Sequence, residues 1–145
     1  MTAAPVLQTA AQAPAAHWAS RYVGQPFDPA EQHCWAFARR VWREVFGWDV
    51  AALDVSALDP RRLRRDFADH PEYGQWRQVQ TPVEAPVEGD AVIMAQGRHP
   101  CHIGIWIAPA RVLHAIAGSG GIATPVGRLG DLGYRLHGFW RRVGA

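Results

Sequence analysis

The sequence predicts a single α+β domain, with N-terminal helices packed on a C-terminal antiparallel sheet of about five strands. In the first third of the chain, apolar residues recur at steps of three and four, which indicates helix. After Thr81-Pro82, short apolar runs separated by Gly and Pro indicate strands. Helices followed by strands are typical of α+β proteins. The 145 residues, 48% hydrophobic and 19% charged, suffice for one core and argue against disorder.

The N-terminal part of the chain predicts a flexible arm, residues 1–16, ahead of a folded domain, residues 17–145. The arm is rich in Ala and has no basic residue ahead of an apolar run, so it lacks the charged start of a secretory signal. No window approaches the roughly 20 apolar residues of a membrane span, and we expect no membrane insertion. A short helix is expected over residues 17–23, where Gly24 ends it.

A longer helix is expected from Asp28 to about Phe46. Asp28 is a suitable N-cap, Pro29 fits the first helical position, and Gly47 supplies the stop. One face of this helix is apolar, and it comprises Cys34, Phe37, Val41 and Val45. We therefore expect the helix to be buried against the sheet.

A second helix is expected over residues 59–68, and residues 71–80 are expected to connect it to the sheet. The helix carries four arginines between Arg61 and Arg65. They are interpreted either as a solvated face or as a contact to an anionic polymer or an acidic protein. The net charge of +2 gives no reason to expect a nucleic-acid partner.

The strands expected after Pro82 bring two histidines together. The five strands are residues 91–95, 102–107, 111–117, 121–126 and 134–143. If the second and third form a hairpin centred near Ala108, His102 lies directly opposite His114; if the centre is Pro109, the two are diagonal neighbours. Either register puts both imidazoles on one face, with Cβ atoms about 5 to 7 Å apart.

Cys34, early in the long predicted helix, is the candidate nucleophile. The partial positive charge of a helix N-terminus favours a thiolate. Cysteine catalysis also needs a histidine base whose second ring nitrogen is held by another polar group. Cys34, His102 and His114 can fill these roles of nucleophile, base and orienting residue. Taken singly, each could instead be a buried structural residue.

Zinc binding and a disulfide are the alternative interpretations of these residue types. Cys101 and His102 are adjacent on a predicted strand and should point to opposite faces, so both could bind one metal only at a β-bulge. The same alternation predicts that Cys101 lies away from Cys34 and forms no disulfide with it. We therefore expect no metal and no other cofactor.

Four segments resemble the NlpC-type cysteine peptidases and occur in the order of that family. They are residues 33–41, 87–93, 102–107 and 112–115. The resemblance covers roughly residues 18–143 and implies a reduced papain-like fold, in which a helix bearing the cysteine packs on a sheet bearing the histidines. Members of the family typically cut the stem peptides of peptidoglycan, so the resemblance implies that substrate here.

The resemblance also implies roles for individual residues. By position, Cys34 resembles the nucleophile, His102 the general base and His114 the orienting residue, and no cofactor is implied. Gly89-Asp90 resembles the turn that starts the first strand of the family's sheet.

The substrate pocket is where the chain departs from the family. Tyr22 resembles the family tyrosine near the pocket, and we expect Tyr22, His33 and Trp35 to contact substrate. The family usually has Asp before the cysteine and Ser-Gly after it, where this chain has His33 and Trp35-Ala36. The Asp and Ser side chains bind the free amine of the stem peptide in many members, so this chain departs from that specificity.

The pattern Cys-Trp-x-x-x-Arg-Arg-Val from Cys34 and the segment 133–141 look most like phage tail members of the family. The expectation is a cysteine-type peptidoglycan endopeptidase that acts at a phage tail tip during cell entry, with tail-tip proteins as partners. It would be made in the host cytoplasm and carried in the virion. The alternatives are a tail-tip assembly protein with incidental or no activity, an antibacterial cell-wall effector, and an acyltransferase.

Overall fold

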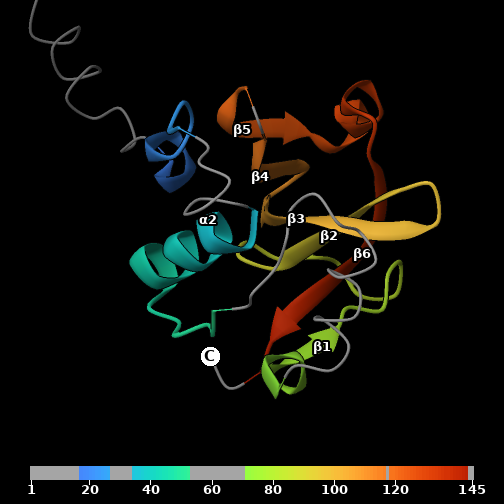
Figure 1. Cartoon of the computed structure of the whole chain (residues 1–145). Coiled ribbons are helices and arrows are strands. Elements are labelled where there is room, and N and C mark those ends of the chain that lie inside the picture. The colour runs from blue at the N-terminus through green and yellow to red at the C-terminus, as the bar shows by residue number, and fades with distance from the viewer. Residues whose placement is uncertain (1–16, 27–33, 53–70, 117, 144–145) are drawn as a thin grey trace, which may run out of the picture.

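The computed structural model of the chain describes residues 17–26, 34–52, 71–116 and 118–143. Its elements are η1 (Trp18–Arg21), α2 (Cys34–Val41), η2 (Trp42–Phe46), η3 (Pro71–Gln75), β1 (Trp76–Gln78), β2 (Ala91–Gln96), β3 (His99–Ile107), β4 (Arg111–Ile116), β5 (Gly120–Pro125), η4 (Val126–Leu132) and β6 (Arg135–Arg142). Short helical segments and α2 accompany one antiparallel sheet (Figure 1). The predicted α+β class is therefore confirmed.

The sheet has six strands in the order β1-β6-β2-β3-β4-β5, with every described pairing antiparallel. The five predicted strands are present with boundaries shifted by up to three residues. The additional strand is β1, which lies in the segment interpreted as a connector. It has only three residues, two of them exposed, and exists because it pairs with β6. Such a pairing between distant segments leaves no hydrophobic pattern in the sequence.

The long helix ends where the sequence predicts. α2 and η2 form one helical stretch from Cys34 to Phe46, and Gly47 closes it with a φ of +72°. The Gly47 N–H donates to the carbonyls of Arg43 and Trp42, because a left-handed glycine can turn back onto the last helical turn. The predicted helix start at Asp28, the helix at 59–68 with its arginines, and the arm at 1–16 lie outside the described residues.

The two faces of the sheet carry two hydrophobic clusters. One cluster joins the buried side of α2 to the sheet and includes Cys34, Phe37, Val41, Cys101, Ile103, Ile105, Ile107 and Leu113. The other includes Val92, Met94, Trp106, Val112, Leu129 and Phe139, and lies where η4 covers the opposite face. The period-two alternation predicted for β3 is therefore confirmed, since Ile103 and Trp106 fall in different clusters.

The segment after η1 covers the outer edge of β5. The Gly24 N–H donates to the Gly121 carbonyl at 2.8 Å, and the Gly121 N–H donates to the Gln25 carbonyl at 2.9 Å. A Cβ at Gly121 would lie 2.1 Å from the Tyr22 carbonyl oxygen, so only glycine permits this approach. The contact holds the segment that follows η1 against β5, and Figure 1 shows residues 17–26 beside that edge of the sheet.

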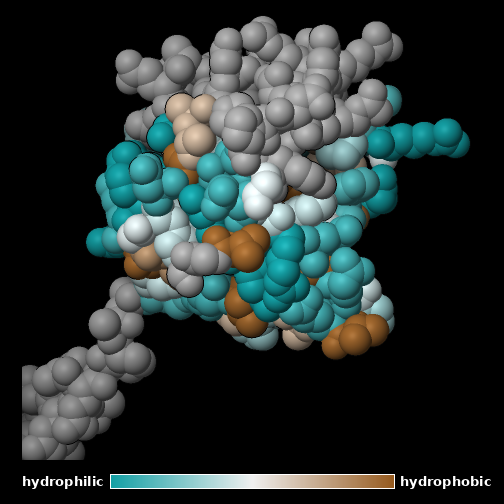
Figure 2. Space-filling model, turned by 90° about the horizontal axis from the view of Figure 1, so that it is seen from below, coloured by the Kyte–Doolittle hydropathy of each residue, from teal (hydrophilic) through white to brown (hydrophobic). Residues whose placement is uncertain are grey.

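In the view of Figure 2, the residues that the structure describes form no extended apolar area. Hydrophilic residues predominate on that face, and hydrophobic residues form small separate spots. Val83 is the most exposed large hydrophobic residue described, at 94%. Within the described ranges, no helix has the length and apolar character needed to cross a membrane.

Candidate active site

Two buried histidines on neighbouring strands form the centre of the candidate site. His102 on β3 and His114 on β4 are joined by a hydrogen bond, with Nε2 and Nδ1 2.8 Å apart. The strands pair with Ile105 opposite Leu113, so the hairpin is centred on Pro109 and the histidines are diagonal neighbours. Of the two registers that the sequence allowed, the structure selects this one, and the shared face is confirmed.

Gly104 makes room for this pair. In the observed register, Gly104 lies level with His114. A Cβ there would fall 3.1 Å from the His114 Cβ, 2.5 Å from the Val112 Cγ1 and 2.8 Å from the Leu113 carbonyl oxygen. Any side chain at this position would therefore push β3 and β4 apart.

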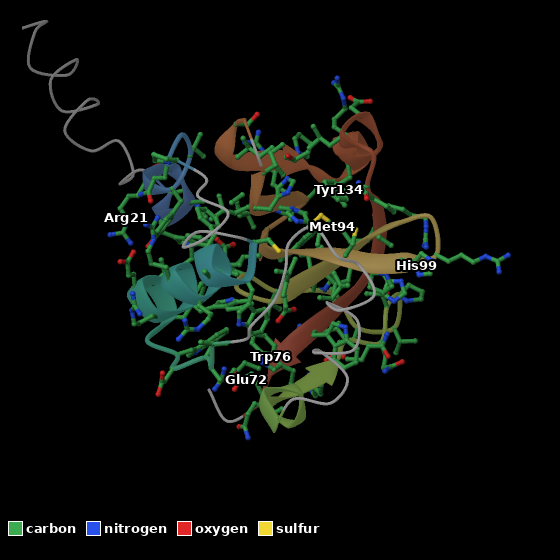
Figure 3. The ribbon with its side chains drawn as sticks, in the orientation of Figure 1. Arg21, Glu72, Trp76, Met94, His99 and Tyr134 are labelled. Carbon is green, nitrogen blue, oxygen red and sulfur yellow. The ribbon has the colours of Figure 1, made fainter. Side chains whose placement is uncertain are left out.

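Two further side chains fix the imidazoles. The hydroxyl of Thr124 on β5 lies 2.9 Å from His114 Nε2, and the Tyr134 ring stacks on His102 with centroids 4.6 Å apart and planes 11° apart. Figure 3 shows Tyr134 close to Met94. Neither Thr124 nor Tyr134 was among the site residues predicted from the sequence. The predicted strand 121–126 placed Thr124 in the sheet, but its contact with His114 depends on the register between β4 and β5. No pattern in the neighbouring sequence distinguishes Tyr134.

Burial keeps both histidines neutral. It lowers the pKa of His114 to about 4. Burial, and then the neighbouring His114, lower the pKa of His102 well below its ordinary value. A neutral imidazole has one N–H and one lone pair, so the pair can hold and accept a proton at neutral pH.

Cys34 begins the described part of α2, and its side chain is 1% exposed. Burial raises the pKa of the Cys34 thiol to about 11, although hydrogen bonds from the backbone N–H groups of Ile103, Trp35 and Cys34 oppose the rise. The prediction that Cys34 is a thiolate is therefore wrong for this closed arrangement. Burial destabilises the negative charge more than the backbone N–H groups stabilise it.

The sulfur of Cys34 lies against the strand that carries the predicted base. The hydrogen bond from the Ile103 N–H places it next to the peptide that joins His102 to Ile103. Within the described residues, the ring of His102 bonds to His114, and no hydrogen bond links the sulfur to an imidazole. The structure thus joins the two histidines and brings Cys34 to β3, the strand of His102.

Cys101 occupies a β-bulge beside the site. Met94 pairs with His102 but Ala95 pairs with Pro100, which leaves Cys101 as the extra residue. Cys101 shares the cluster of Cys34, so the prediction that it lies away from Cys34 is wrong. Burial, and then the two thiols, raise the pKa of Tyr134, whose ring stacks on His102, so both sulfurs lie near the ring that packs on the predicted base.

Both cysteines are free thiols. Among the residues that the structure describes, no three His, Cys, Asp or Glu side chains gather as a metal would require.

Two of the residues predicted to contact substrate, Tyr22 and Trp35, have polar atoms engaged within the fold. The hydroxyl of buried Tyr22 donates to Glu44 at 2.7 Å, and the indole N–H of Trp35 donates to the Ala51 carbonyl at 2.9 Å. His33 lies outside the described residues. Contact of these three residues with substrate stays a prediction.

The Gly89-Asp90 turn leads into β2 and anchors it. Buried Asp90 accepts from Arg141 Nε and Nη2 at 3.0 and 2.8 Å, and from the Val87 N–H at 2.8 Å. The Gly89 carbonyl accepts from the Trp42 indole at 2.9 Å. The turn therefore ties β2 to β6 and to the helix that follows Cys34.

Fold and site together define an α+β domain of papain-like layout, with a cysteine on the helix and a histidine pair on the sheet. No protein-family model matches the chain, and no curated protein matches it. Among solved structures, the chain is similar to the NlpC/p60 domain of the peptidoglycan hydrolase SagA. The TM-score is 0.51 and the identity 18%, over 81% of this chain and 89% of that chain. The chain has the NlpC/p60 type of fold.

Proposed function

We propose that the protein is a cysteine peptidase that hydrolyses amide bonds in the stem peptides of peptidoglycan. The observation that carries the proposal is the 2.8 Å hydrogen bond between His102 and His114, with Cys34 in contact with the strand of His102. The fold shared with an NlpC/p60 domain of a peptidoglycan hydrolase supports the substrate class. No step of this chemistry requires a metal or another cofactor.

The reaction begins from a neutral thiol and a neutral imidazole. Nε2 of His102 bonds to His114, which leaves Nδ1 as the nitrogen that can take the Cys34 proton. As the proton moves, the sulfur attacks the carbonyl carbon, and the backbone N–H of Cys34 is a donor available to the oxyanion. His102 then gives the proton to the leaving amine as the C–N bond breaks, which produces a thioester.

Water completes the reaction. His102 takes a proton from water, the resulting hydroxide attacks the thioester, and the C–S bond breaks. The carboxylic acid product leaves, and the proton on His102 returns to the Cys34 sulfur. Because Cys34 and His102 are 1% and 6% exposed, substrate binding must open a path to them.

Purified protein incubated with isolated sacculi tests this function. We expect the wild type to release soluble peptides and new free amino groups, and Cys34→Ala to release none above background, because the nucleophile is lost. Cys101→Ala removes the neighbouring buried thiol and should retain activity, which makes it the matched control. Release by Cys34→Ala at the wild-type rate would contradict the proposal.

We also propose a phage tail tip as the setting, with tail-tip proteins as partners and the virion as location. The support is the sequence pattern that follows Cys34 and the segment 133–141. A phage carrying Cys34→Ala should assemble normally and infect poorly. Normal infection by that phage would favour a structural tail-tip role, and genes for secretion beside this one would favour an antibacterial effector.

A further inference from the structure

We propose that Thr124 is a positioning residue that sets which ring nitrogens of His114 and His102 carry protons. The inference rests on the proposed function, since it concerns the base of that reaction. Its basis is the contact between Thr124 Oγ1 and His114 Nε2 at 2.9 Å, made by two buried side chains. The hydrogen bond between His114 and His102 extends this contact to the base.

The three side chains form a diagonal line across one face of the sheet. Val112 pairs with Thr124 and His114 pairs with Ile122, so Thr124 lies two residues along the strands from the level of His114. His102, on β3, lies two residues along in the other direction. Thr124 therefore contacts His114, and His114 contacts His102, each across a pair of adjacent strands. Because all three side chains are buried, little water competes for these hydrogen bonds.

The direction of the hydrogen bonds along this line decides whether His102 can act as a base. If the Thr124 oxygen accepts from His114 Nε2–H, then His114 Nδ1 accepts from His102 Nε2–H. The lone pair of His102 is then on Nδ1, the nitrogen that must take the Cys34 proton. If Thr124 donates instead, every proton shifts one place and His102 carries Nδ1–H, which cannot accept it.

We infer that the wild-type line runs in the productive direction, with Thr124 as acceptor. Replacing Thr124 with Val keeps the shape but removes the acceptor, so His114 Nε2–H would be left buried without a partner. His114 then favours its other tautomer, with the proton on Nδ1, and this tautomer blocks the base. Thr124→Ser retains the hydroxyl and should preserve the wild-type tautomers.

Nitrogen-15 NMR of the histidine rings tests the inference directly. In the wild type and in Thr124→Ser, we expect His102 Nδ1 unprotonated and Nε2 protonated; in Thr124→Val we expect the reverse. Protonated Nδ1 in the wild type, or the same tautomers in Thr124→Val, would overturn the proposal. This readout needs no turnover, so it separates failure of the inference from failure of the proposed function.

Kinetics on the same variants provide the second readout. Thr124→Val should lower kcat by roughly 10- to 100-fold with KM unchanged, and Thr124→Ser should recover most of it. Ile122→Val, on the same face of β5, is the control for a small packing change and should match the wild type. If Thr124→Val keeps the wild-type kcat, or Thr124→Ser loses as much as Thr124→Val, Thr124 has no positioning role. An inactive wild type would contradict the proposed function alone.

Discussion

At the scale of single residues, the candidate site depends on how little space separates β3 from β4. His102 and His114 meet because the position level with His114 on β3 is Gly104. Burial keeps both imidazoles neutral, and the hydroxyl of Thr124 on β5 contacts the outer nitrogen of His114. The site is thus built from uncharged groups, in a buried place where a charged side chain would destabilise the fold.

Gly104→Ala should lower the free energy of unfolding by about 1 to 3 kcal/mol. The added methyl would lie 2.8 Å from the Leu113 carbonyl oxygen, which is backbone and cannot move without shifting β4. Urea unfolding measures the effect. Gly127→Ala is the matched control, because a Cβ there meets nothing within 4 Å. Equal stabilities for the two variants would mean that the close approach at Gly104 is absent in solution.

At the scale of elements, charged pairs hold the sheet in the order that presents the histidines. Asp90, at the start of β2, receives two hydrogen bonds from Arg141 of β6, and Arg141 also donates to Glu84. Because β6 pairs with β2, and β2 with β3, this contact supports the strand that carries His102. The element that bears the predicted base is therefore anchored two strands away.

Asp90→Asn should destabilise the protein by about 2 kcal/mol, since it removes a buried charged acceptor from Arg141 and Val87. The comparison is Asp131→Asn, which removes an exposed pair with Arg128 on η4 and should cost less than about 0.5 kcal/mol. Chemical denaturation of both variants at neutral pH measures the difference. If Asp90→Asn lowered the free energy of unfolding no more than Asp131→Asn, the buried Asp90–Arg141 pair would not anchor β2.

At the scale of the whole molecule, one sheet separates two hydrophobic clusters, and its histidines lie among buried side chains. Folding therefore excludes protons from these imidazoles. The unfolded chain takes up a proton on each histidine near pH 6.5, whereas folded His114 does so only near pH 4. The stability of the molecule is coupled to pH through this difference.

Stability should accordingly be complete above pH 6.5 and fall as the pH is lowered towards 4. For His114 alone the loss approaches about 3 kcal/mol, and His102 adds a loss in the same direction. Urea unfolding at several pH values between 4 and 7 measures the slope. His114→Gln should flatten it, whereas Ile122→Val, which removes no titratable group from the strand beside His114, should leave it unchanged. If the stability of His114→Gln depended on pH as steeply as that of the wild type, His114 would not be buried and neutral in the folded protein.

Much of the architecture follows from local pattern, and the site follows only in part. The stop at Gly47, the five longer strands and the shared face of His102 and His114 were predictable, because each depends on neighbours in the chain. The strand β1 was not predictable, because only its pairing with β6 makes it a strand. The direction of the Cys34 pKa was mispredicted for the same reason, since burial by distant segments outweighs the local helix dipole.

The sequence by itself determined the order of helix and strands and the face on which both imidazoles lie, because side-chain periodicity is a property of the chain. The tertiary structure decided the register centred on Pro109, the sheet face that α2 covers, and the partners Thr124 and Tyr134. These depend on contacts between segments far apart in the chain, whose free energies are set by packing and burial and leave no local pattern.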